Sequence, residues 1–170
     1  MRILRILAAT AVLAVSANAQ STKPTDPLNA GFTKLQSLVG EWEGSAIHEG
    51  KEIPSTTSFR LVSDGSAIMD DLAPGTPHEM VTMFHMDGND LLATHYCSHH
   101  NQPRLRAVPT TDPNVLEFAF KDATNLVNPE DPHMTGVKFT ILDPSRHIEE
   151  WIATANGHSI TLRFEFHRKP

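Results

Sequence analysis

The sequence predicts an all-β protein, an up-and-down antiparallel barrel of about ten strands with one short N-terminal helix that closes one end. Three observations indicate this fold. Short segments of alternating apolar and polar residues follow one another along the chain, turn residues separate them, and only one segment has helical apolar spacing. A closed barrel is favoured because it leaves no exposed edge strand, and a two-sheet sandwich is the alternative.

The N-terminal residues MRILRILAATAVLAVSANAQ have the pattern of a secretory signal peptide. Arg2 and Arg5 form the charged start, residues 6–15 the apolar core, and residues 17–19 the small-residue cleavage site. The apolar run is too short to cross a bilayer. We therefore expect residues 1–19 to be cleaved after Ala19, and the product to reach the bacterial periplasm or the medium without membrane insertion.

The remaining chain is expected to hold a flexible polar leader, residues 20–28, and one barrel domain, residues 29–170. The helix is expected over Asn29–Val39, because Phe32, Leu35 and Leu38 recur at helical spacing. Gly40 follows as a C-cap.

Ten strands are then expected in succession, at residues 41–49, 54–63, 66–72, 80–86, 90–97, 104–109, 114–121, 133–142, 146–155 and 157–167. The stretches HMDGNDL and TANGHS are turn signals that join neighbouring strands as hairpins. Residues 122–132 form the one long loop.

Alternation predicts which side chains face the barrel interior. It is clearest in three late strands, where the expected inward residues are Leu116, Phe118 and Phe120, then His133, Thr135, Val137, Phe139 and Ile141, then His158, Ile160, Leu162, Phe164 and Phe166.

The composition excludes some classes of partner. The formal net charge is −6, and removal of Arg2 and Arg5 with the signal peptide takes it to −8. This charge argues against nucleic acid and anionic membrane surfaces as partners. Cys97 is the only cysteine, so no internal disulfide is possible, and we expect it to be buried and slow to react. The oligomeric state is left open.

The stretch THYCSHHNQPRLR, residues 94–106, concentrates polar side chains. Successive hairpins reverse the chain, so the first strand can be taken to run from a lower end at Trp42 to an upper end. Because each strand reverses direction, residues from distant segments are expected to meet at the upper end. We take these residues as a ligand site: His95, Asn101, Gln102, Arg104, His133 and His158. At the lower end, Arg168 is expected to lie over the indole of Trp42, in a cation–π contact.

The motif LVGEWEG, in which Gly40 and Trp42 open the first strand after a short helix, resembles the calycin-like barrels: lipocalins, fatty-acid-binding proteins and nitrobindin-like barrels. The resemblance implies a ligand-binding barrel in which Gly40 and Trp42 are structural. The segment HYCSHHNQPR is similar to segments of uncharacterised secreted bacterial proteins.

The leading interpretation is a secreted barrel that binds a small, largely apolar molecule with a polar or anionic head, for which Arg104 would be a partner.

Two alternatives involve other chemistry. His95, Cys97 and His133 would form a zinc or copper site, since histidine and cysteine two residues apart on a strand point the same way. The nitrobindin resemblance implies haem held by a histidine of the last strand, which is His158 here. A third interpretation makes Cys97 the nucleophile of an enzyme with His95 or His133 as its base, and no catalytic residue is assigned.

Overall fold

The computed structural model describes residues 27–48 and 50–170. Within them lie one helix and ten strands: α1 (Pro27–Gln36), β1 (Gly40–His48), β2 (Lys51–Val62), β3 (Ala67–Leu72), β4 (Met80–Asp87), β5 (Asp90–Tyr96), β6 (Gln102–Val108), β7 (Val115–Thr124), β8 (His133–Asp143), β9 (Arg146–Ala155) and β10 (His158–Arg168). Each strand pairs antiparallel with the next, and β10 pairs with β1, so the sheet closes. The predicted fold class is confirmed.

The predicted elements differ from the observed ones mainly at their ends. The helix ends at Gln36, and residues 37–39 follow as tight turns in which each amide donates to the carbonyl three residues earlier. β7 extends to Thr124, which shortens the predicted long loop. The predicted signal peptide, residues 1–19, and most of the predicted leader, residues 20–28, lie outside the described residues.

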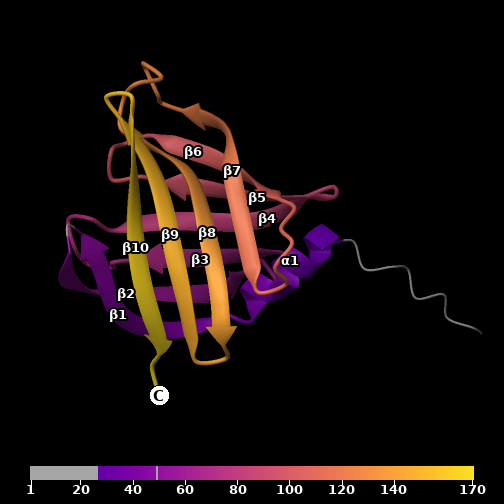
Figure 1. The fold of residues 1–170 in the computed structure, drawn as a ribbon. Helices are drawn as coiled ribbons and strands as arrows, with labels where there is room; N and C mark the ends of the chain where they lie inside the picture. The colour runs from indigo at the N-terminus through magenta and orange to yellow at the C-terminus, as the bar shows by residue number, and fades with distance from the viewer. Residues whose placement is uncertain (1–26, 49) are drawn as a thin grey trace, which may run out of the picture.

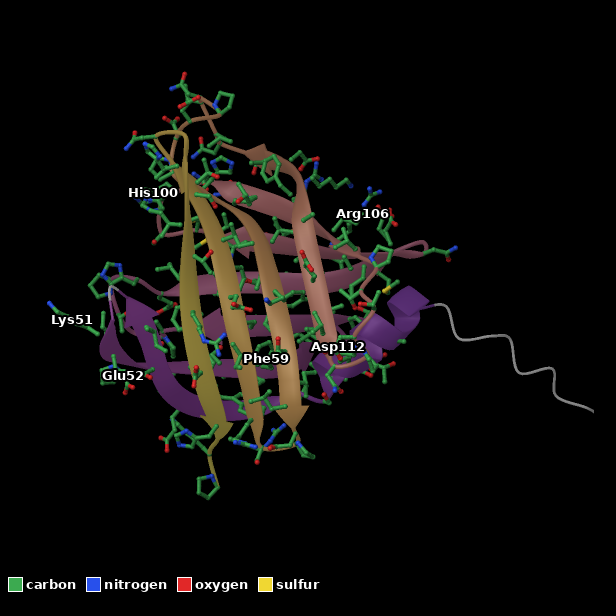
Figure 2. All side chains as sticks on the ribbon, in the orientation of Figure 1. Lys51, Glu52, Phe59, His100, Arg106 and Asp112 are labelled. Carbon is green, nitrogen blue, oxygen red and sulfur yellow. The ribbon has the colours of Figure 1, made fainter. Side chains whose placement is uncertain are left out.

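The barrel has two different ends. Strands β7–β10 run from top to bottom in Figure 1, in front of β2–β6, which run across the view. The connections β1–β2, β3–β4, β5–β6, β7–β8 and β9–β10 lie at the upper end, and α1 lies at the lower end. Figure 2 labels His100 at the upper end and Asp112 at the lower end. No helix in the described part of the chain is long and apolar enough to cross a membrane.

The lower end is closed by the helix and by the first and last strands. Leu35 and Leu38 of the α1 region are buried in the core. Trp42 is buried, its indole nitrogen donates to the Leu38 carbonyl at 2.7 Å, and Arg168 lies over its ring at 4.2 Å. The expectations that the helix plugs this end and that Arg168 covers Trp42 are confirmed.

Alternation along the strands separates the core from the surface. Phe59, Phe84, Phe118 and Phe139 are almost fully buried. Phe139 contacts the other three edge to face, and Phe84 and Phe118 contact each other at a tilted angle. In Figure 2, Phe59 lies among the enclosed side chains, whereas Lys51, Glu52 and Arg106 project outward. Aromatic side chains therefore occupy much of the middle and lower parts of the barrel.

Candidate functional site

A cavity of about 500 Å³ lies at the upper end of the barrel. Much of its wall is apolar, from inward residues of the five strands β1, β3, β4, β8 and β10: Ala46, Leu72, Met80, Met134, Leu162 and Phe164. Its polar groups come from the upper-end connections and strand ends: Ser55, Thr76, His78, Cys97, Ser98 and His99. Among the described residues that line it there is no Lys, Arg, Asp or Glu. An apolar wall with a few polar groups is typical of a small-molecule site.

A larger groove of about 620 Å³ lies over the outer face where β1, β2, β9 and β10 meet. Its wall includes the charged or polar side chains of Glu52, Arg146, Glu165 and His167, and it is open to solvent. The upper-end cavity encloses a ligand better, and we take it as the candidate site.

A row of three buried polar side chains lies one inward position below the cavity wall. Asp70, Thr82 and His95 are opposite one another on β3, β4 and β5, and each is at most 1% exposed. Two residues further toward the upper end, on the same strands, Leu72, Met80 and Cys97 line the cavity. Because inward residues recur at every second position, the polar row lies directly beneath this wall.

The hydrogen bonds of this polar row are incomplete. The Thr57 hydroxyl donates to Asp70 Oδ1 at 2.6 Å, and the Thr82 hydroxyl lies 2.9 Å from His95 Nδ1. Asp70 Oδ2 and His95 Nε2 have no partner among the described residues. A buried polar atom without a partner costs about 1–3 kcal/mol, so these two atoms mark a place where another molecule can bind.

The opposite wall of the barrel supplies a satisfied polar group and an aromatic surface. Glu149 is fully buried, and its carboxylate accepts a hydrogen bond from His147 Nε2 at 2.9 Å and another from Trp151 Nε1 at 2.8 Å. The Trp151 ring lies 4.8 Å from the His95 ring. Glu149 is therefore occupied by protein partners, whereas Asp70 has one oxygen free.

Burial disfavours the charged forms of Asp70, His95 and Cys97. Burial first, and then the nearby Glu149 carboxylate, raise the pKa of Asp70 well above its ordinary range. Burial lowers the pKa of His95 to about 4. It also raises the pKa of the Cys97 thiol. A thiol with a raised pKa is a poor nucleophile, so the geometry does not favour Cys97 as a catalytic group.

Two residues of the predicted site face the interior. His95 and Cys97 follow the inward alternation of β5 with Leu91 and Ala93, as one of the two alternatives for this strand predicted. Cys97 is 8% exposed and borders the cavity. The expectation that it is buried is confirmed. His95 lies below the cavity wall, deeper than predicted.

Three residues that were expected at the barrel mouth have other partners, and their placement corrects the prediction. Pro103 and Leu105 are the inward residues of β6, so Arg104 faces outward, where it forms a bidentate pair with Asp122 at 2.5 and 2.7 Å. The Asn101 amide donates to the Pro132 carbonyl, and Gln102 accepts a hydrogen bond from Thr124. These contacts tie the β5–β6 connection to neighbouring segments, and Arg104 supplies no cation to the cavity.

The two predicted histidines of the late strands also lie outside the cavity. A register shift between Met134 and Gly136 changes the alternation, so Met134 and Val137 join the core. His133 instead packs against Phe120, with ring centroids 5.3 Å apart, and its Nδ1 donates to the Asp131 carbonyl at 2.7 Å. His158 is exposed beside the β9–β10 turn. Phe120, expected to face inward, is 41% exposed.

These placements bear on the metal and haem interpretations. Among the side chains that the structure describes, no three of His, Cys, Asp or Glu are arranged to hold a metal ion. His133 lies apart from His95 and Cys97 because it is not on the inward face. His158 does not line the cavity, so the residue that the nitrobindin resemblance would assign to haem does not fit an iron held there.

The sequence reasoning identified His95 but did not assign Asp70, Thr82 or the Glu149 cluster to the site. Their signal is present in the alternation: Asp70 separates the inward Ile68 and Leu72, and Glu149 separates the inward His147 and Trp151. A charged residue at an inward position of a strand is a marker for a functional or structural polar site.

Comparison with known proteins supports the fold. No family model and no curated protein matches the sequence. The structure is similar to that of a protein of unknown function of the DUF3598 family from Nostoc punctiforme, with a TM-score of 0.55 and 13% identity over 80% of this chain. The chain spans about half, 49%, of that protein.

It is also similar to Rv2717c from M. tuberculosis, with a TM-score of 0.55 and 16% identity over 82% of this chain and 97% of that chain. At these identities the similarity shows the barrel fold alone. The described chain is thus a closed ten-strand antiparallel barrel that shares its fold with both proteins.

Proposed function

We propose that this protein is a calycin-like binding barrel that holds a small, largely apolar molecule in the upper-end cavity. The observation that carries the proposal is the cavity itself, which has an apolar wall, no charged side chain in its described lining, and a volume within the range of about 300–1,000 Å³ of small-molecule sites. Burial of the apolar part of the ligand would supply most of the binding free energy.

The one-sided closure of the barrel supports this function. Leu35, Leu38, Trp42 and Arg168 close the lower end, while the cavity borders the upper-end connections. A ligand would therefore enter and leave between the β1–β2, β3–β4 and β5–β6 connections. Thr76, His78 and His99, at this opening, are exposed polar residues of the cavity lining.

The proposal includes export. The charged start, apolar core and small-residue site of residues 1–19 support secretion to the periplasm or the medium, where the barrel would sequester or carry its ligand. The predicted partner is a small molecule, and the negative net charge gives no support to a nucleic-acid partner.

Native mass spectrometry of the protein from its own host tests both parts. We expect an organic adduct on a chain that begins at Gln20. Ala46 lines the cavity and lies opposite Phe164 on β10, so Ala46→Trp should fill the opening and remove the adduct. The control is Glu117→Trp, on the exposed face of β7.

The control variant should keep the adduct. An adduct that Ala46→Trp leaves in place in a folded protein would contradict the cavity as the binding site. A chain that retains Met1–Ala19 would contradict export.

A further inference from the structure

We propose that the ligand carries an uncharged hydrogen-bonding group, such as an alcohol hydroxyl or a carboxamide, and that this group binds to Asp70 and His95 beneath the cavity. This inference rests on the proposed binding function and specifies the chemistry of its ligand. It assigns a specificity role to two residues deeper than the cavity wall.

The first argument is position. Asp70 and His95 flank Thr82 in the row that crosses β3, β4 and β5, and the three residues above them line the cavity. Of those three, Met80 is only partly buried and has an unbranched, flexible side chain. A rotamer change at Met80 would connect the cavity with the polar row.

The second argument is the pair of free atoms. Asp70 Oδ2 and His95 Nε2 are buried and without partners among the described residues, while Asp70 Oδ1 and His95 Nδ1 are bound by Thr57 and Thr82. The two threonine hydroxyls hold the carboxyl and the imidazole in fixed orientations. A ligand group that can donate and accept would satisfy both free atoms.

The third argument is charge. No Lys, Arg, Asp or Glu is found among the described residues of the cavity wall, and Arg104 is engaged by Asp122 on the outer face. The Glu149 carboxyl group is already hydrogen-bonded to His147 and Trp151. Burial raises the pKa of Asp70 and lowers that of His95, so it disfavours the charged form of each. A cavity wall without a counter-ion disfavours a charged ligand head on desolvation grounds.

Binding of three probes that share one alkyl chain tests the inference: decanol, decanoate and decylammonium. Affinities are measured at neutral pH with the mature protein by displacement of a fluorescent apolar dye. We expect decanol to bind at least about tenfold more tightly than either charged probe, which corresponds to about 1.4 kcal/mol.

Variants then locate the preference. Asp70→Leu and His95→Phe each remove a free polar atom, and each should weaken decanol binding by about tenfold. Asp70→Asn keeps a donor and an acceptor and should stay within about threefold of the unmodified protein. Met134→Leu is the matched control in the cavity wall on β8, away from the polar row, and it should change the affinity for all three probes by the same factor. Thermal melting verifies that each variant is folded.

The possible results separate this inference from the proposed function. If the probes bind with equal affinity, or if folded Asp70→Leu and His95→Phe bind decanol as tightly as the unmodified protein, the polar row has no role in recognition although the barrel binds ligands. Tighter binding of decylammonium would also contradict the inference, since it requires ionised Asp70. If no probe displaces the dye and the dye itself does not bind, the binding function fails as well.

Discussion

At the scale of single residues, burial shifts the pKa values of polar side chains inside this barrel. His95 is the clearest case, because its ring lies 4.8 Å from Trp151, its Nδ1 is bonded to Thr82, and burial lowers its pKa to about 4. Its ordinary pKa is 6.5. The folded state therefore binds a proton at His95 less readily than the unfolded state does.

The pH dependence of stability follows from this difference. Above pH 6.5 His95 is neutral in both states, and its contribution to stability is fully present. As the pH falls from 6.5 toward about 4, the unfolded chain gains a proton that the folded protein does not, and stability is lost. Asp70 acts in the opposite direction, because its raised pKa means that stability falls as the pH rises above 3.8.

His95→Phe isolates the histidine contribution, since phenylalanine keeps a ring beside Trp151 and does not titrate. Between pH 7 and pH 5, the free energy of unfolding of the unmodified protein should fall by about 2 kcal/mol more than that of His95→Phe. Urea denaturation at both pH values measures this. His158→Phe, which removes an exposed histidine, is the control. Equal pH dependence of His95→Phe and the unmodified protein would show that His95 is not buried in its neutral form.

At the scale of elements, the closure of the lower end depends on one contact between the first and last strands. Trp42 and Arg168 are register partners of β1 and β10. The Arg168 guanidinium donates to the carbonyls of Ser37, Val39 and Pro144 at 2.7–2.9 Å. Gly40 has a φ of 138°, a conformation that side chains rarely adopt, and a Cβ there would meet Arg168. The Gly40 and Trp42 motif thus has a physical reason. Gly40 leaves room for the Arg168 side chain, which lies over Trp42 and connects the residues after the helix with the first and last strands.

Arg168→Ala should lower the free energy of unfolding by about 2–4 kcal/mol, because it removes hydrogen bonds from a charged donor and a cation–π contact. Denaturant titration measures the change. Arg106→Ala is the control, since Arg106 is exposed and its ion pair with Asp90, at 3.6 Å, should contribute less than about 1 kcal/mol. A loss at Arg168 no larger than that at Arg106 would contradict its role in closure.

The same elements show what the sequence could predict. Ten strands were predictable because turn residues and alternation are local signals, and antiparallel order follows from short connections. The direction in which His133 faces was not predicted. The register shift between Met134 and Gly136 changes the alternation of β8, and the sequence reasoning assumed an unbroken alternation. Arg104 was correctly predicted to lie near the upper end, but it faces outward and not inward. Its position along the strand indicated which end of the barrel it lies near, and it did not indicate which face it is on.

At the scale of the whole molecule, the barrel is closed at its lower end and has a cavity at its upper end. The apolar core and α1 fill its lower and middle parts, the row of Asp70, Thr82 and His95 crosses it beneath the cavity, and the cavity opens among the upper connections. This layered arrangement was beyond sequence reasoning, because it needs contacts between β3, β5 and β9 that only the closed sheet creates. The sequence correctly indicated a barrel with polar groups at one end, and the structure assigns the inward polar groups to other residues.

The central claim is that a small apolar molecule binds in the upper-end cavity. NMR of the methionine methyl groups tests this claim most directly. Met80 and Met134 line it, Met86 packs near the lower end, and Met69 and Met83 lie opposite each other on β3 and β4, outside the cavity lining. Methyl NMR spectra of methionine-labelled protein should be recorded during titration with decanol. The account predicts saturable shifts of the Met80 and Met134 methyl signals, with those of Met69, Met83 and Met86 unchanged. Shifts confined to Met69 and Met83, or no saturable shift at Met80 and Met134, would contradict it.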